Sequence, residues 1–385
     1  MGRTGKRGHV REQVLSKPAL LREFTPKFDR QVREVLNHQV SLDIKRVFAF
    51  GCGDSHNAAV TTRMAFQKWA AIPMEAQTAL EFSRFTTPWL NDGRPHQPLA
   101  IGISVSGEVA RTVEGVSLAR EAGAYTMGIT CNKDSRIVDL AHMALDVSIP
   151  AMDIPRVRTY TATQVALYQV ALRLAEVRNA ISYKTGRTIR DYFMQAADIG
   201  EATHAAVSDT VRQLANDLKD KPGYIFLGGG PNLGSAMFSA AKILEAEGSF
   251  AQPQDLEEWV HLQRFLKTTG TPTFLIAPAG LSYSRAVEVA RVIKRVRAFL
   301  VAIVEEGEKE ISKIADVVLP VKGHLPEEMT PLVYSDALEM FASDLADASG
   351  EPYFRAFEGP WATPDGDPIW FNEVLNSRKQ LELNR

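Results

Sequence analysis

LAIGISVSGEVARTVEGVSLAREA, residues Leu99–Ala122, is the stretch that decides the fold class of the chain. An apolar run over 99–103 predicts a strand, and apolar side chains that recur from Val109 onward at helical spacing predict a helix. The turn between them, Ser104-Val105-Ser106-Gly107-Glu108, would bring two hydroxyls and free backbone N–H groups to a helix N-terminus, which favours an anion. The stretch therefore predicts a phosphate site. The alternative is that Ser106 is only an N-cap.

Length and composition describe an ordinary globular chain. Of the 385 residues, 45% are hydrophobic and 23% are charged, which is enough for two domain cores. The formal net charge of −2 gives no general attraction to nucleic acid, so we expect no such partner. The two cysteines predict no disulfide framework. The sequence shows neither a signal-peptide core nor an apolar run long enough to span a membrane, which predicts a cytoplasmic protein.

Strands and helices alternate along the chain, which predicts parallel sheets with helices on both faces. The predicted strands are Arg46–Phe50, Met74–Gln77, Leu99–Ile103, Ala124–Thr130, Ala144–Ile149, Thr273–Ala277 and Phe299–Ile303. The predicted helices include Thr161–Ala180, Pro231–Glu247, Asp255–Leu266, Tyr283–Arg297 and Pro331–Ser349. Gln13–Leu42 is expected to form a helical arm that Pro18 and Pro26 interrupt.

The second half of the chain repeats the order of the first. Phe50-Gly51-Cys52-Gly53 matches Leu227-Gly228-Gly229-Gly230 at an offset of 177 residues (227 − 50). Tyr125–Ile129 matches Phe299–Ile303 at an offset of 174 (299 − 125). The near-constant offset predicts a duplicated α/β domain, joined by a helical segment over 181–221.

Polar turns follow three of the strands predicted in the first copy. Gly51–His56, Ser104–Glu108 and Thr130–Ser135 carry hydroxyl, amide and carboxylate groups. Ligands of open parallel sheets bind at this edge, and these groups suit a polyhydroxyl ligand with a phosphate. A dinucleotide fingerprint is the alternative because two glycines follow the first strand, but His56 stands where its third glycine should be. We therefore expect no cofactor.

The second copy offers acid and base groups instead of a second phosphate turn. Its matching turn reads Ile276-Ala277-Pro278-Ala279-Gly280, and the proline lacks an N–H donor. Lys242 and Glu245 are three residues apart on one predicted helix, as are Glu258 and His261 on the next, so each pair shares a face. Such a carboxylate can move a proton between sugar carbons, and an imidazole can assist ring opening. An ordinary surface contact is the alternative for each pair. No spacing of cysteines or histidines predicts a metal site.

These motifs resemble those of the sugar isomerase (SIS) domain family, in its double-domain branch, over residues 46–355. ISVSGE is similar to the family's ISQSGET phosphate loop, GCGDSHNAA to its CGTSYHAG loop, and AAKILEA to its ALKLKEI helix. The branch includes the isomerase half of glutamine–fructose-6-phosphate amidotransferase, glucosamine-6-phosphate deaminases and fructosamine-6-phosphate deglycases. The resemblance implies an α/β fold of two tandem SIS domains, each a mostly parallel, doubly wound, flavodoxin-like sheet.

The resemblance also implies which residues hold the substrate. Ser104 and Ser106 match the phosphate-binding serines of the family, whereas Val105 and Val109 replace a glutamine and a threonine that help to hold the phosphate. The residues implied in substrate binding are Gly53, Asp54, Ser55, Ser104, Ser106, Gly107, Glu108 and Glu258.

The implied catalytic residues lie in the second copy. Lys242 matches the family's sugar-site lysine, Glu245 its enolisation base, and His261 the ring-opening histidine, which the family donates across a dimer interface. The resemblance thus implies a homodimer and an enzyme that acts on a phosphorylated amino sugar or sugar–amine adduct. Deaminase, deglycase and ketose–aldose isomerase all remain open.

Two further expectations concern what the chain does not do. The first predicted strand begins at Arg46, so we expect no amino-terminal glutaminase domain and no full amidotransferase activity. The alternative function is a regulator that binds a sugar phosphate without turnover. The residues before the first strand are too few for the DNA-binding helix-turn-helix that such regulators usually carry.

The expected organisation has five parts. They are a helical arm (1–45), a first SIS domain (46–180), a helical linker (181–221), a second SIS domain (222–350) and a tail (351–385). We expect a phosphate held by the serine turn of the first domain to leave its sugar carbons within reach of Glu245 of the second.

Overall fold

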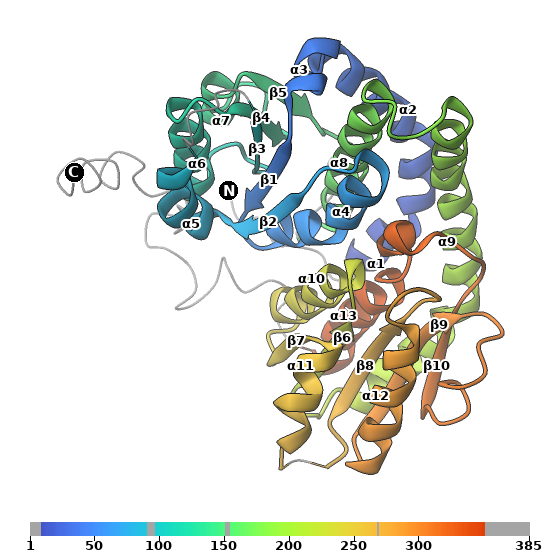
Figure 1. Ribbon diagram of the computed structural model, residues 1–385. Coiled ribbons are helices and arrows are strands. Elements are labelled where there is room, and N and C mark those ends of the chain that lie inside the picture. Colours follow the sequence, from blue (N-terminus) through green and yellow to red (C-terminus); the bar gives the residue numbers. More distant parts are fainter. Residues whose placement is uncertain (1–8, 91–96, 151–154, 268, 351–385) are drawn as a thin grey trace. The chain divides into compact units, whose positions relative to one another are not determined.

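The computed structural model describes residues 9–90, 97–150, 155–267 and 269–350 (Figure 1). They divide into two compact units, each with its own sheet. One unit, the first copy, contains Glu23–Pro150 and Ala162–Thr188; the other, the second copy, contains residues 9–22, 155–161 and 189–350. The expected C-terminal tail lies outside the described residues.

The first copy is built on a five-stranded, fully parallel sheet with the order β2-β1-β3-β4-β5. Its strands are β1 (Arg46–Gly51), β2 (Met74–Thr78), β3 (Pro98–Ile103), β4 (Tyr125–Thr130) and β5 (Met143–Asp146). The helices between them are α4 (Asp54–Ala70), α5 (Ala79–Glu81), the π-helix η1 (Phe82–Thr86), the 3₁₀-helix η2 (Thr87–Trp89), α6 (Ala110–Glu121) and α7 (Arg136–Leu140). This strand order is that of flavodoxin-like folds, as expected.

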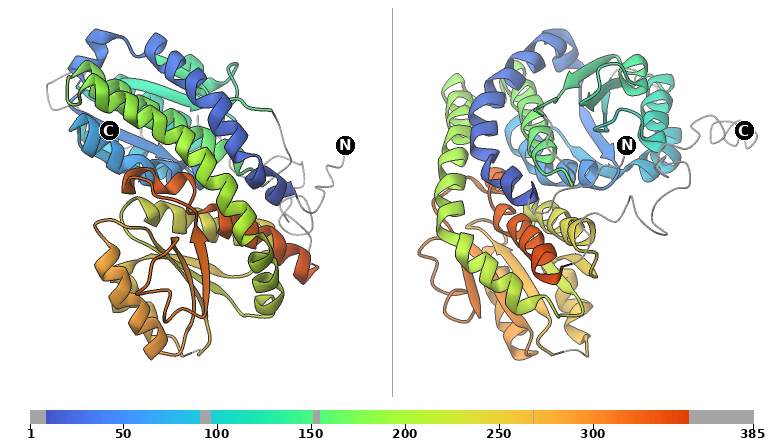
Figure 2. Two further views of the ribbon diagram at one scale, coloured as in Figure 1. Left: turned by 90° about the vertical axis from the view of Figure 1, so that its right-hand side faces the viewer. Right: turned by 180° about the vertical axis from the view of Figure 1, so that it is seen from behind.

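The second copy has the same topology, with its strands in the order β7-β6-β8-β9-β10. The strands are β6 (Tyr224–Gly228), β7 (Ala251–Asp255), β8 (Pro272–Ala277), β9 (Phe299–Glu305) and β10 (Val317–Val321). The helices are α10 (Pro231–Ala246), α11 (Leu256–His261), η3 (Gln263–Phe265), α12 (Tyr283–Arg295), η4 (Glu327–Leu332) and α13 (Asp336–Ser349). The orange helix α12 and the red helix α13 lie on opposite faces of this sheet (Figure 2).

Three helices at the start of the chain and two long ones in its middle complete the fold. They are α1 (His9–Leu15), α2 (Lys17–Val35), α3 (His38–Asp43), α8 (Arg158–Val177) and α9 (Tyr183–Leu218). Pro18 is the second residue of α2, where a missing N–H is tolerated. The expectation that Pro26 interrupts the arm is wrong, because α2 continues through it.

The duplication predicted from the sequence is present in the backbone. The turn after β1 places Gly53 at φ 53°, ψ −122°, and the turn after β6 places Gly230 at φ 55°, ψ −124°. In both turns this glycine caps the helix that follows its strand. The two copies therefore present the same edge, at the carboxyl ends of their strands, where ligands of such sheets bind.

Each sheet packs its large aromatic side chains against helices. In the first copy the rings of Phe50 and Phe82 stack with their centroids 3.9 Å apart. In the second copy the rings of Phe226 on β6 and Phe274 on β8 stack, and the ring of Phe341 on α13 packs against Phe274 at a tilt of 50°. Trp259 of α11 is buried on the face that α12 covers. These contacts anchor η1, α11 and α13 on the sheets.

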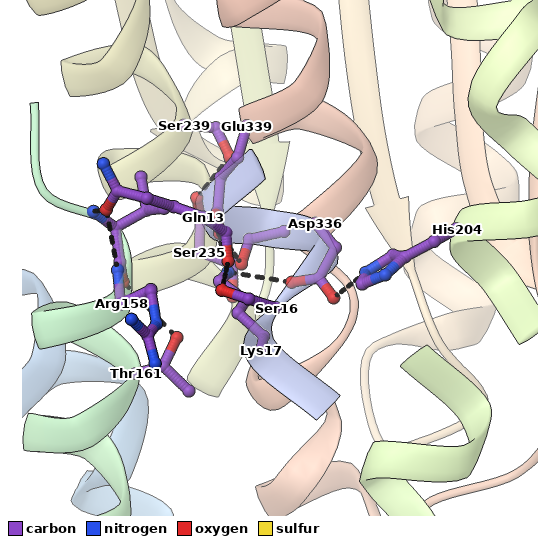
Figure 3. Close-up of polar contacts among 12 residues, drawn as sticks. Gln13, Ser16, Lys17, Arg158, Thr161, His204, Ser235, Ser239, Asp336 and Glu339 are labelled. Carbon is purple, nitrogen blue, oxygen red and sulfur yellow. Dashed lines mark hydrogen bonds and ion pairs between the residues drawn. The ribbon is translucent and has the colours of Figure 1, made fainter. Parts of the chain in front are cut away.

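A buried cluster of charges ties α2 to α13 within the second copy (Figure 3). Lys17 Nζ lies 2.9 Å from Asp336 Oδ1 and 2.5 Å from a carboxylate oxygen of Glu339, and His204 Nε2 lies 2.7 Å from Asp336 Oδ2. Burial alone would raise the pKa of the Asp336 carboxyl, but Lys17 and His204 outweigh it and hold that pKa below its usual range. Four buried titratable groups thus replace apolar packing at this position.

Candidate active site

In the first copy, hydrogen bonds to the Ser104 and Ser106 hydroxyls stabilise the backbone of the serine turn, Ser104–Glu108. Ser104 Oγ accepts the backbone N–H groups of Gly107 and Val109 at 3.1 and 3.5 Å, and Ser106 Oγ accepts that of Glu108 at 3.2 Å. Ser104 is buried, whereas Ser106 is half-buried. The three N–H groups expected to bind a ligand therefore donate to the serines, and the two hydroxyl oxygens lie 3.4 Å apart, within reach of a hydrogen bond to each other.

Gly107 and Glu108 lock this turn onto the loop that follows β4. Gly107 has a φ of +72°, and a Cβ there would lie 2.0 Å from Ser135 Oγ, so no other residue fits. Glu108 Oε1 accepts the backbone N–H of Arg136 at 2.9 Å, and its other oxygen pairs with the Arg136 side chain. Glu108 is thus a brace for the loop, and its charge is neutralised by Arg136.

Gly53, Asp54 and Ser55 lie at the neighbouring strand end. Gly53 caps α4, and Asp54 and Ser55 are the first residues of that helix, half-buried. Asp54 is an acid in the first helical turn, where the macrodipole stabilises it. Since β1 and β3 are adjacent in the sheet, the turns that follow these two strands lie at its topological switch point, and the third predicted turn follows the neighbouring strand β4.

The equivalent place in the second copy holds a carboxylate of the chain itself. Glu327 Oε2 accepts the backbone N–H of Leu281, in the turn between β8 and α12, at 2.8 Å. A Cβ at Gly280 would lie 2.3 Å from the Glu327 carboxyl carbon, so the glycine makes room for the carboxylate. Glu327 is 9% exposed. The second copy therefore binds an internal anion at its switch point, which nothing in the local sequence around Gly280 indicated.

Lys242 and Glu245 meet on α10, as their spacing predicts. Lys242 Nζ forms an ion pair with Glu245 Oε2 and lies 4.8 Å from the centroid of the Phe238 ring. The Lys242 side chain is fully buried, whereas that of Glu245 is 32% exposed. A buried ammonium that holds a partly exposed carboxylate fixes the position of that carboxylate, which is a group that can transfer protons.

Glu258 and His261 share the short helix α11, but the imidazole contacts a different acid. His261 Nε2 lies 3.2 Å from Glu257 Oε1, and both side chains are more than half exposed. Glu257 is also paired with Arg285, at 2.6 Å, which together with His261 holds the Glu257 pKa below its usual range. The backbone N–H of Glu258 donates to Asp255, the N-cap of the helix.

A surface cavity of about 270 Å³ lies beside the Glu327 turn, at the carboxyl ends of β8 and β9. Its polar lining includes Tyr283, Glu305, Glu308 and His324. Tyr283 Oη donates to Glu308 Oε1 at 2.6 Å, and His324 Nδ1 lies 3.0 Å from Glu305 Oε2. This edge of the second copy is therefore acidic, unlike the hydroxyl-lined turn of the first.

Comparison with known proteins identifies the motif-bearing part of the chain. Residues 42–173 match the SIS domain family. A relative from Tropheryma whipplei, named glutamine–fructose-6-phosphate aminotransferase [isomerizing], is 28% identical over 324 residues, which cover 80% of this chain and 50% of the relative. The chain spans about half the length of the curated relatives it matches.

Solved structures extend the likeness to both copies. The C-terminal domain of glucosamine-fructose-6-phosphate aminotransferase from Francisella tularensis has a TM-score of 0.79 at 18% identity, covering 92% of this chain and 99% of that one. A structure titled glucosamine-6-phosphate deaminase from Thermotoga maritima has a TM-score of 0.65 at 17% identity, covering 90% and 98%. At these identities the structures establish the fold, which is that of two tandem SIS domains. Among the described residues, no helix combines the length and apolarity needed to cross a membrane.

Proposed function

We propose, on the premise that this chain belongs to the SIS domain family, that it is a phosphosugar isomerase-type enzyme acting on a phosphorylated amino sugar or sugar–amine adduct. The observation that carries the proposal is the Lys242–Glu245 ion pair on α10, in a chain that also carries the Ser104–Glu108 turn. One provides an oriented carboxylate, and the other provides hydroxyl donors for a phosphate. The sequence predicts Lys242 and Glu245 on one helix face, and it predicts that both the hydroxyls and the N–H groups of the turn bind the anion.

In the proposed reaction the serine turn binds the phosphate and Glu245 carries the proton. For an open-chain 2-amino aldose, Glu245 removes the proton from C2 and returns it to C1, while O1 gains a proton and the amine nitrogen loses one, which leaves an imine at C2. Water hydrolyses this imine to a ketose phosphate and ammonia. For a fructosamine 6-phosphate, whose nitrogen is on C1, the proton moves from C1 to C2 instead, and water hydrolyses the imine at C1 to an aldose phosphate and the free amine. Lys242 fixes the carboxylate and stabilises the negative charge that develops on the sugar oxygen.

His261 is proposed to open the sugar ring of a neighbouring protomer in a homodimer. Three side chains that follow it are exposed apolar groups: Leu262 (57% exposed), Phe265 (68%) and Leu266 (53%). A solvated helix end with such side chains suits contact with a second copy of the chain. Phe265→Asp should give a monomer by light scattering and lose turnover, whereas Tyr183→Asp, a change at another exposed ring, should leave the dimer intact.

An ammonia-release assay over a panel of hexosamine 6-phosphates tests the enzymatic proposal. Release of ammonia together with a ketose phosphate supports a deaminase, and release of an amine from a fructosamine 6-phosphate supports a deglycase. The non-catalytic regulator remains the second candidate because Val105 and Val109 give the turn no side-chain donors. Calorimetric binding with no ammonia, no amine and no isomer formed would favour the regulator and refute the enzyme.

A further inference from the structure

The ammonium of the proposed catalytic pair is buried to a degree that is rare for lysine. Lys242 is fully buried, whereas lysine side chains usually keep their charged end in water. Withdrawing an ammonium from water and fixing a long side chain in one rotamer both cost free energy. Glu245 supplies the opposite charge, but its side chain is 32% exposed. The position of the ammonium therefore depends on what packs against the lysine as well as on this carboxylate.

An aromatic ring on the same helix packs against that ammonium. Lys242 Nζ lies over the Phe238 ring, 4.8 Å from its centroid, which is within the range of a cation–π contact. The two residues are four apart on α10, so their side chains share a face of the helix. Phe238 is fully buried, and a cation–π contact strengthens when it is desolvated. The ring therefore stabilises the position in which the ammonium meets Glu245.

A second ring fixes the orientation of Phe238. The centroids of Tyr160 and Phe238 are 3.6 Å apart and the ring planes differ by 6°, so the rings stack. Tyr160 lies in the first turn of α8, within residues 155–161 of the second copy, and is 3% exposed. Phe238 cannot tilt without losing this stack, which adds to the stabilisation from the area that both rings bury. Contacts thus run from Tyr160 to the ammonium that pairs with Glu245.

From these contacts we infer that Phe238, held by Tyr160, is a positioning residue for the proposed reaction. It keeps the Lys242 ammonium against Glu245 and so fixes the carboxylate that moves the proton. The inference rests on the proposed function, because it assigns to two rings the support of that function's base. A catalytic group displaced by about 1 Å can lose about a hundredfold in rate. The role therefore predicts a loss in kcat with little change in KM.

Steady-state kinetics on the full chain, with glucosamine 6-phosphate and a fructosamine 6-phosphate as substrates, test this role. Phe238→Leu keeps an apolar side chain but removes the ring, so kcat should fall by about tenfold or more while KM changes less than about threefold. Phe238→Tyr keeps the ring and should recover part of the lost kcat. Tyr160→Leu removes only the supporting ring and should lower kcat by a few-fold.

The matched control is Phe226→Leu. Phe226 is also fully buried, and its ring stacks on that of Phe274 with the centroids 4.8 Å apart. This change should cost about as much stability as Phe238→Leu, measured as the loss of urea midpoint, and should leave kcat unchanged. The control thus separates the loss of packing from the loss of the contact with Lys242.

A double-mutant cycle measures the contact itself without turnover. If Phe238 supports the Lys242 ammonium, the loss of urea midpoint in the double variant Phe238→Leu/Lys242→Met should be smaller than the sum of the two single losses. The same cycle with Phe226→Leu in place of Phe238→Leu should be additive. Additivity at Phe238 would refute the contact.

The outcomes separate this inference from the function beneath it. If Phe238→Leu keeps the kcat of the unaltered chain, the positioning role is refuted while the proposed function stands, and the same holds if Phe226→Leu lowers kcat equally. If the unaltered chain turns over neither substrate, both are refuted. Should Phe238→Leu fail to fold, Tyr160→Leu replaces it, and an unchanged kcat in that variant refutes the positioning role.

Discussion

Two turns at the same place in the two copies deal with an anion in different ways. In the first copy, the turn after β3 presents serine hydroxyls braced by Glu108 and Arg136. In the second copy, the turn after β8 binds the carboxylate of Glu327 through the N–H of Leu281. The comparison teaches that duplication preserved the turn at the carboxyl end of the central strand but gave it different contents in the two copies. We propose that the first copy uses it to bind a ligand, whereas the second copy fills it with its own Glu327.

The copies also differ in the helix that follows the first strand of each sheet. Helix α10 of the second copy carries the buried Lys242 and the partly exposed Glu245, whereas α4, its counterpart in the first copy, begins with Asp54 and Ser55. We therefore expect a division of labour, in which changes in the first copy alter binding and changes in the second alter turnover or stability.

The largest expected effect separates chemistry from binding. Glu245→Gln removes the proposed base but keeps a side chain of the same size, so kcat should fall by about 10²–10⁴-fold while the Kd for a substrate analogue changes only a few-fold. The measurement combines steady-state kinetics with calorimetry. Glu288→Gln, which alters an exposed pair with Arg285 on α12, is the control and should leave kcat unchanged. Normal turnover by Glu245→Gln would refute the assignment.

The next effect tests how the second copy holds α13. Lys17→Met leaves Asp336 and Glu339 buried without their ammonium partner (Figure 3), which should lower the free energy of unfolding by about 3–5 kcal/mol. Urea denaturation measures the change. Lys27→Met, on the same helix and in an exposed pair with Glu23, should cost less than about 1 kcal/mol. Equal effects of the two changes would mean that the buried cluster is not a source of stability.

A third change acts on binding by the first copy. Ser106→Ala removes a hydroxyl donor to the proposed phosphate and should raise the Kd for fructose 6-phosphate by about tenfold to a hundredfold. Ser282→Ala, in the matching turn of the second copy, should leave this Kd unchanged. If Ser282→Ala raised this Kd and Ser106→Ala left it unchanged, the phosphate site would have to be assigned to the second copy instead of the first.

The internal anion of the second copy should have a smaller effect. Glu327→Gln keeps an oxygen that can accept the Leu281 N–H but removes the charge, so the bond changes from charge-assisted to neutral. We expect a loss of about 1 kcal/mol in unfolding free energy. Chemical denaturation provides the measurement, with Glu288→Gln again as control. An unchanged or higher stability would contradict the view that this turn needs an anion.

The sequence predicted the parts of this comparison that depend on local patterns. Continuous apolar strands, Gly-rich turns and repeat offsets were enough for the fold, and spacing along one helix was enough to bring Lys242 and Glu245 together. The edge strand β7 was missed because AQPQD contains a proline and three polar residues, and its pairing with β6 overrides that composition. β10 was missed as well. Glu327 and Lys17 were missed because their partners are distant in the chain, so no spacing rule connects them.

The expected pairing of Glu258 with His261 also shows the limit of spacing rules, because in the structure His261 contacts a different acid. Their spacing was read as one acid–base unit, but His261 contacts Glu257, one turn away, and Glu257 in turn holds Arg285 of α12. Residues three apart and residues four apart both share a face of a helix. The sequence spacing alone therefore does not show whether His261 contacts Glu258 or Glu257, and in the structure Glu257, which also holds Arg285, is the partner. Their assigned roles stay predictions.

The smallest effect concerns pH and is confined to the acidic cavity of the second copy. Burial raises the pKa of the Tyr283 hydroxyl and would raise that of Glu308, but hydrogen bonds from Tyr283 and from the backbone of Ile311 and Ser312 instead lower the Glu308 pKa to about 2. Its stabilisation is therefore present above the ordinary carboxyl pKa near 4.5 and is lost as the pH falls from there towards 2.

Glu308→Gln removes that titration, so its unfolding free energy should vary less between pH 4.5 and 2 than that of the unaltered chain. Tyr283→Phe should show a complementary change in alkali. The Tyr283 pKa is raised to about 12, so this group contributes stability below pH 10 that is lost as the pH rises through 12. Denaturation across both ranges measures the slopes. If Glu308→Gln and the unaltered chain had the same acid slope, the Glu308 carboxylate would not be held by these bonds, and the acidity of this edge would not separate the two copies.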